Sequence, residues 1–160
     1  MFDKQQAFKR QLDRSVDYAA VLDQIADHCS FSLSVEAIRH AMPLESVQAA
    51  AQELAFVQEG MEYVRIGKDL SMGGVSDIMP YVQSAQKSIT LLPAELNSIA
   101  LFLSAVNNVC HAFEEEREPR LFEYASVMDP CEKLRRQIEA MIDLSGNIKE
   151  NATPALYGKI

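Results

Sequence analysis

The sequence has few of the residues that interrupt helices. It contains six glycines and six prolines among 160 residues. Because Gly and Pro mark the frequent turns of β-sandwiches, their scarcity favours long helices. Apolar residues make up 48% of the chain and charged residues 24%, which is close to the globular average and argues against a disordered chain. The length is sufficient for one domain with its own hydrophobic core.

The sequence also lacks long apolar runs. None approaches the ~20 residues that a membrane-spanning helix needs, and residues 1–5 contain no apolar stretch typical of a signal peptide. The cysteines are Cys29, Cys110 and Cys131, an odd number in apolar stretches, which predicts buried, reduced thiols. We therefore expect a cytoplasmic protein without a membrane partner.

Clustered basic residues are scarce as well. The net charge is −8, whereas a surface that binds nucleic-acid phosphates needs grouped Lys and Arg side chains. The nearest group is Lys133, Arg135 and Arg136. Glu132 and Glu139 lie beside it in the sequence. This segment is therefore a poor DNA-binding candidate by itself.

Two stretches carry the spacing of long amphipathic helices, residues 44–65 and 93–116. Apolar residues recur at steps of three and four, which places them on one face of a helix in a heptad-like seam. The first seam is Val47, Ala50, Leu54, Val57, Met61 and Val64, and the second is Leu96, Ile99, Leu103, Val106, Cys110 and Phe113. Two long helices with matching seams predict an all-α helical bundle.

Shorter helices are predicted between and around the long ones, over residues 34–41 and 120–127 among others. Ser15 is the expected N-cap of a helix over 17–29, and Ser76 of one over 77–85. Asp129 is expected to cap a further helix, with Pro130 at its first position. The Gly-centred residues 142–149 are compatible with a small β-hairpin.

Thr153 and Pro154 resemble the start of another helix, six residues before the sequence stops. We therefore expect residues 1–160 to be one helical segment truncated from a longer chain.

No catalytic, cofactor-binding or metal-binding constellation stands out. Gly67-Lys68 and Gly73-Gly74 lack the spacing of phosphate-binding loops. His28-Cys29 and Cys110-His111 are adjacent pairs, which point about 100° apart on a helix and cannot readily hold one ion. The acidic pair Glu114 and Glu118 is best explained as part of a solvated face.

The order of several short motifs resembles the second bacterial branch of the MutS family, from about residue 15 onward. Gly73, Gly74, Asp77, Ile78 and Pro80 match that branch's Gly-Gly-apolar-x-Asp-Ile-x-Pro element. Near the end, Asp143 and Gly146 match its Ile-Asp-x-x-Gly-x-apolar stretch. The sequence departs from the pattern at Leu92, where a Ser cap is expected, and at Gly158, where an Arg-rich helix is expected.

The resemblance implies a structural role. The segment would be the N-terminal part of the helical core, or lever, domain of a homodimeric ATPase that lacks the mismatch-reading domain. That protein would bind ATP and Mg²⁺ and act on DNA through other domains, in DNA repair or suppression of recombination. It often carries a C-terminal nuclease module, and in some bacteria it also engages ribosomes. The segment's partner would then be the remainder of its parent chain.

Two alternatives remain open from the residues alone. The first is a free-standing helical module that binds a protein partner through an exposed Met/Leu face. The second is a small helical enzyme, which no group of residues in the sequence supports.

Overall fold

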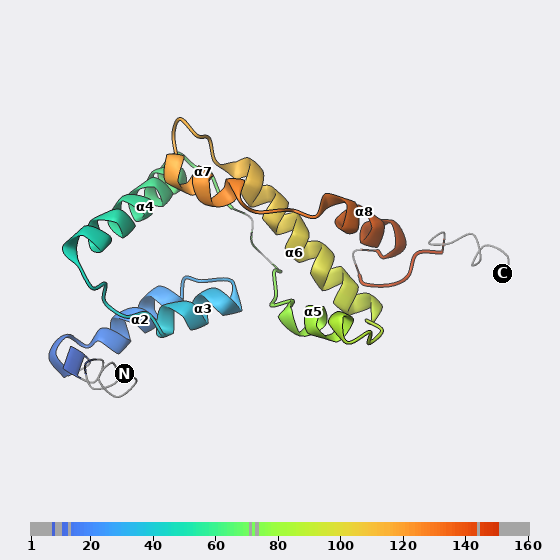
Figure 1. Ribbon diagram of the computed structural model, residues 1–160, viewed down its shortest axis with the longest axis horizontal. Helices are drawn as coiled ribbons and strands as arrows, with labels where there is room; N and C mark the ends of the chain where they lie inside the picture. The colour runs from blue at the N-terminus through green and yellow to red at the C-terminus, as the bar shows by residue number, and fades with distance from the viewer. Residues whose placement is uncertain are drawn as a thin grey trace. The chain divides into compact units, whose positions relative to one another are not determined.

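The computed structural model describes residues 8–150 except 9, 10, 13, 71, 73 and 144. Within these residues the regular secondary structure is helical and no strand forms, which confirms the all-α prediction. The order along the chain is α2 (Tyr18–Ala26), α3 (Ser32–Arg39), α4 (Val47–Arg65), α5 (Met79–Gln86), α6 (Pro93–Ala112), α7 (Pro119–Ser126) and α8 (Glu132–Met141) (Figure 1).

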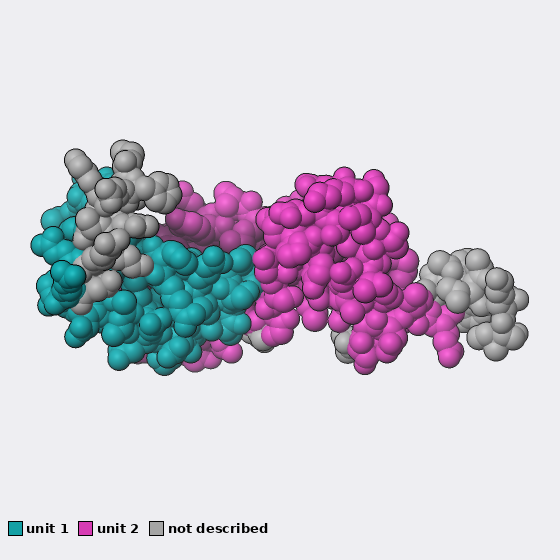
Figure 2. All heavy atoms as spheres, turned by 90° about the horizontal axis from the view of Figure 1, so that it is seen from below, with its two compact units in different colours: residues 1–51 teal, residues 52–160 magenta. Residues whose placement is uncertain are grey.

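The chain divides into two compact units, residues 1–51 and 52–160, shown in separate colours in Figure 2. The boundary between them falls inside α4. That residues 1–160 form one segment of a larger core domain stays a prediction.

In the first unit α2 packs against α3. Leu22 and Ala26 are buried on α2, and Arg39 donates a hydrogen bond to Asp23 at 3.0 Å. The prediction that Ser15 caps this helix is wrong. The N-cap position is held by Asp17 in a left-handed conformation with φ of 49°, because the Ser15 hydroxyl instead donates to the Gln11 carbonyl one turn earlier.

The first predicted seam does not pack as expected. Leu54, Val57, Met61 and Val64 are 51 to 68% exposed, and Val47 is 88% exposed. Ala50 of the seam is half-buried, but the larger covered side chains of α4, Phe56, Glu59 and Tyr63, lie on another face. The three- and four-residue spacing identified an apolar face correctly, but burial depends on a partner surface, and within the described structure the partners contact the aromatic face.

The second predicted seam lies on α6, the central helix of the second unit. Leu103 is buried and the other seam residues are half-buried, because α7 and α8 pack against this helix (Figure 1). Ala100, Ile138 and Ile142 form its buried cluster. The helix begins at Pro93 as predicted and ends at Ala112, just before the run of acidic residues.

The hydrogen bonds at the starts of α5 and α8 differ from the predicted N-caps. At α5 the Asp77 carboxylate, rather than Ser76, accepts a hydrogen bond from the Met79 amide at 2.8 Å. At α8 the Asp129 carboxylate accepts from the Cys131 amide at 2.8 Å. The helix itself begins at Glu132, because Cys131 adopts a left-handed conformation with φ of 43°.

The segment after α8 does not form the predicted β-hairpin. A single antiparallel bridge joins Ile142 to Ile148. The Asp143 carboxylate accepts hydrogen bonds from the Ser145 and Asn147 amides at 2.9 and 2.8 Å, so the chain reverses too tightly for a longer ladder. The helix start predicted at residues 153–154 lies outside the described residues.

Candidate functional site

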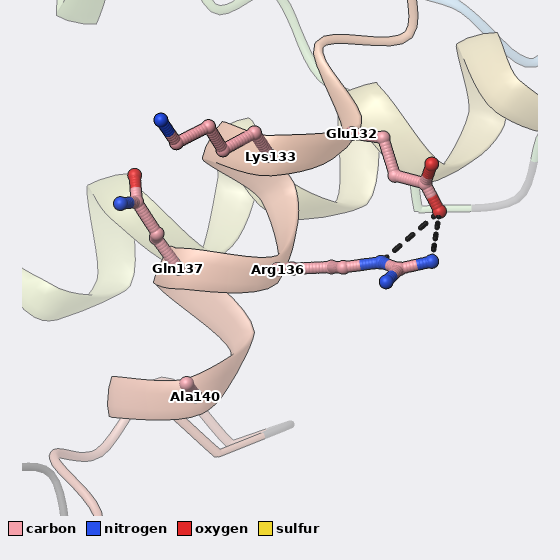
Figure 3. Close-up of a pocket in the computed structure, with 5 residues that line it drawn as sticks. All are labelled: Glu132, Lys133, Arg136, Gln137 and Ala140. Atoms are coloured by element: carbon pink, nitrogen blue, oxygen red, sulfur yellow. Dashed lines mark hydrogen bonds and ion pairs between the residues drawn. The ribbon is translucent and has the colours of Figure 1, made fainter.

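One hollow on the surface of the second unit lies along α8 (Figure 3). Its volume is about 440 Å³, and its lining residues are Glu132, Lys133, Arg136, Gln137 and Ala140. All of them come from one helix, so the hollow is an open face rather than a cleft. Arg136 is turned back onto Glu132, with a shortest distance of 2.6 Å.

The basic group on α8 is paired with its acidic neighbours. Arg135 bonds to Glu139 at 2.7 Å and lies 3.7 Å from Glu132. Arg136 forms the second pair with Glu132. Because two of the three basic side chains are committed to carboxylates on the same helix, this face offers little net positive charge to a phosphate backbone.

A second hollow of about 500 Å³ lies between α5, α6 and α8 and is almost entirely apolar. Its lining is Val82, Ala85, Gln86, Leu91, Leu96, Ile99, Leu134 and Ile138. Apolar walls without converging polar groups suit packing by an apolar side chain and provide no acid, base or nucleophile.

The residues considered for metal or thiol chemistry are scattered. Within the described part of the chain, no three His, Cys, Asp or Glu side chains come together as ion ligands. The prediction of buried thiols is wrong for Cys131, which is exposed, while Cys29 and Cys110 are partly buried. Cys110 lies 3.7 Å from the carbonyl oxygens of Ala125 and Met128, so its thiol fills the contact between α6 and α7.

The prediction that Glu118 belongs to a solvated face is wrong. It is only 2% exposed, and its carboxylate accepts a hydrogen bond from the Glu114 amide at 3.0 Å. Glu114 itself is exposed and pairs with Lys68 at 3.2 Å. The buried carboxylate therefore stabilises the turn between α6 and α7.

A joint between α4 and α7 is the most specific polar arrangement in the second unit. The Glu59 carboxylate of α4 accepts hydrogen bonds from the backbone amides of Arg120 and Leu121 at 2.9 and 3.1 Å. These amides belong to the first turn of α7, which opens at Pro119 and has no acceptor of its own. Glu59 therefore caps α7 from a distance of some sixty residues along the chain.

Aromatic contacts surround this joint. Phe56 meets Tyr124 of α7 edge to face, with ring centroids 5.0 Å apart. Tyr63 meets Phe113 in the same manner at 5.1 Å, and the Lys68 ammonium lies 5.2 Å from the Tyr63 ring centroid. The sequence reasoning missed Phe56, Glu59 and Tyr63, although their spacing of three and four residues marks a second stripe on α4.

The residues of the resemblance motifs have structural positions. Gly74 has a φ of +79°, Asp77 caps the start of α5, Ile78 is its N-cap residue and Pro80 lies in its first turn. Gly73 lies outside the described residues.

The second resemblance motif shapes the loop after α8. Asp143 organises that loop, and its backbone hydrogen bond from Asn147 lowers the pKa of the carboxyl below its usual value. Gly146 has a φ of +78°, and a Cβ there would make an ordinary contact with the start of α6, 3.4 Å from the Cα of Ala94.

Comparison with known proteins gives a consistent set of relatives. The chain is 30% identical over 150 residues to "Endonuclease MutS2" of Pelotomaculum thermopropionicum, covering 92% of this chain. Proteins of the same name from Bacillus velezensis and Halalkalibacterium halodurans are each 28% identical over 149 residues. The chain spans about a fifth of their length, 19% in each case. No protein-family model matches the chain.

Proposed function

The chain is homologous to a segment of the MutS2 family, as the motif order predicted, and we propose that it is the N-terminal part of that protein's helical core, or lever. In this role it performs no chemistry of its own. It holds long helices at fixed angles, so that movement at one end of a larger protein reaches the other end.

The observation that carries this proposal is the match over nine tenths of the chain to proteins about five times longer. The α4–α7 joint adds physical support, since a carboxylate cap together with the Phe56–Tyr124 contact resists rotation of α7 against α4. Among the helices in the described part of the chain, none is both long and apolar enough to cross a membrane.

The same proposal assigns the remaining activities to the rest of the parent protein. We place ATP and Mg²⁺ binding, DNA contact and homodimer formation there, together with a cytoplasmic location and a role in DNA repair or suppression of recombination. An association of the parent with ribosomes belongs to the same proposal. For this segment the proposal is that it is not an enzyme.

Two measurements test the proposal. The reading frame beyond Ile160 should encode a Gly-x-x-x-x-Gly-Lys-Ser/Thr motif, and a frame that continues without one contradicts the assignment. In the parent protein, Glu59→Ala should lower the stimulation of ATP hydrolysis by DNA while leaving basal hydrolysis unchanged, because it loosens the α4–α7 joint. Glu62→Ala on the same helix, where Glu62 is exposed and pairs with Arg65, is the matched control.

One observation favours a second candidate, the free-standing interaction module. Leu54 and Met61 are exposed on α4, which is the Met/Leu face that such a module would use. Isolation of one specific protein partner by the purified chain would support this candidate, and a chain that stays monodisperse without a partner would count against it.

A further inference from the structure

The exposed apolar face of α4 requires an explanation. Leu54, Val57, Met61 and Val64, here called the α4 stripe, lie on one side of the helix at steps of three, four and three. Each is more than half exposed. Single apolar residues on a surface are ordinary, but a contiguous stripe of four marks a contact surface.

The spacing of the α4 stripe defines the shape of its occupant. Alternating steps of three and four keep a seam facing a neighbouring helix, with side chains inserted into its holes. A strand or a flat loop offers no such register. The chain's net charge of −8 disfavours an acidic occupant, so the matching surface is an amphipathic helix with neutral or basic flanks.

The area of the α4 stripe decides between a free partner and a tethered one. Four such side chains expose on the order of 400 Å², whereas a stable complex of separate proteins buries about 800 Å² on each partner. A second copy bound through this stripe alone would therefore be too weak to persist. A helix on the same polypeptide needs less area, because its effective concentration is in the millimolar range.

We infer that the α4 stripe is the packing surface for an amphipathic helix supplied by the remainder of the parent polypeptide. This inference rests on the proposed function, under which about four fifths of the protein lies outside this chain, since the chain spans 19% of its relatives. The stripe and the aromatic face then hold α4 from two sides, with Phe56 and Tyr63 against Tyr124 and Phe113 and Met61 facing the added helix.

Cysteine accessibility tests the inference in the chain and in the parent protein. Met61→Cys is on the stripe, and Glu62→Cys is its neighbour off the stripe. Each is introduced after the native cysteines are replaced by alanine. In the 160-residue chain both should react with a maleimide at similar rates. In the parent, Met61→Cys should react roughly tenfold more slowly, since a packed helix protects it, while Glu62→Cys should be unchanged.

Charged variants with the native cysteines retained provide the second measurement. Leu54→Lys combined with Met61→Lys should lower the melting temperature of the parent and leave that of the chain unchanged. Gln48→Lys combined with Gln52→Lys, two exposed residues on another side of α4, is the control pair off the stripe and should alter neither.

Three results would overturn the inference. The first is equal labelling rates of Met61→Cys in the 160-residue chain and in the parent. The second is slow labelling of Met61→Cys already in the isolated 160-residue chain, and the third is protection that increases with the concentration of that chain. The last two would mean that the chain itself or a second copy covers the stripe. None of the three bears on whether the downstream reading frame encodes a nucleotide-binding motif, so the inference and the proposed function fail separately.

Discussion

Removal of the Glu59 carboxylate should measurably destabilise the second unit. Glu59 accepts two backbone hydrogen bonds from the first turn of α7, and its second oxygen lies 3.6 Å from Arg120 Nε. Its side chain is only 15% exposed. Glu59→Ala therefore leaves two amides of a helix start without their acceptor and removes a negative charge from the positive end of the helix dipole.

The magnitude follows from comparable caps. Loss of a helix cap costs about 0.5–2 kcal/mol, and hydrogen bonds to charged groups lie at the upper end of such ranges. We expect Glu59→Ala to lower the free energy of unfolding by about 2 kcal/mol, because water reaches this partly buried site poorly. Glu59→Gln should cost about half of that, since its amide oxygen still accepts but carries no charge.

Urea unfolding followed by circular dichroism is the assay. Glu59→Ala should lower the midpoint without changing the slope, and the melting temperature should fall by about 2–4 °C for each kcal/mol. Glu62→Ala, which removes an exposed carboxylate three residues away on α4, should change stability by less than ~0.5 kcal/mol. If the two alanine variants prove equally mild, then Glu59 does not cap α7 and the joint is absent.

Further substitutions test other parts of the structure. Gly146→Ala should cost about 1–2 kcal/mol, because at a φ of +78° a residue with a Cβ is strained. Gly60→Ala, inside α4 with open space around it, should instead stabilise by about 0.5–1 kcal/mol, and equal signs in thermal melting would contradict this. Ile138→Ala removes a side chain from the buried cluster and should cost about 3 kcal/mol in urea unfolding, while Val57→Ala on the exposed stripe of the isolated chain should stay within ~0.5 kcal/mol. The pKa of Asp143 is lowered in the fold from its ordinary 3.8, so its stabilisation is complete above pH 3.8 and disappears as the pH falls through the lower folded value; Asp143→Asn should reduce the loss of stability over that acidic range, and an unchanged acid limb would refute the role of this carboxylate.

Much of the fold was readable from local chemistry. The three- and four-residue spacing placed α4 and α6 almost correctly, and Pro93 marked the start of α6 because proline suits a first helical turn. The motif order also predicted the relationship to the MutS2 family. Caps were less predictable, since the Ser15 hydroxyl bonds to a carbonyl of the preceding turn, and Asp77 and Asp129 accept from amides two residues ahead.

The sequence by itself determined which segments are helical and which of their faces are apolar, because both depend on neighbours within about one turn. Only the tertiary structure decided which apolar face is covered. It buried Tyr63 and partly covered Phe56 instead of the heptad seam, placed Glu59 at the start of α7, and removed Glu118 from water. Each of these depends on residues distant in the chain meeting in space, and a periodic pattern contains no information about what lies opposite it.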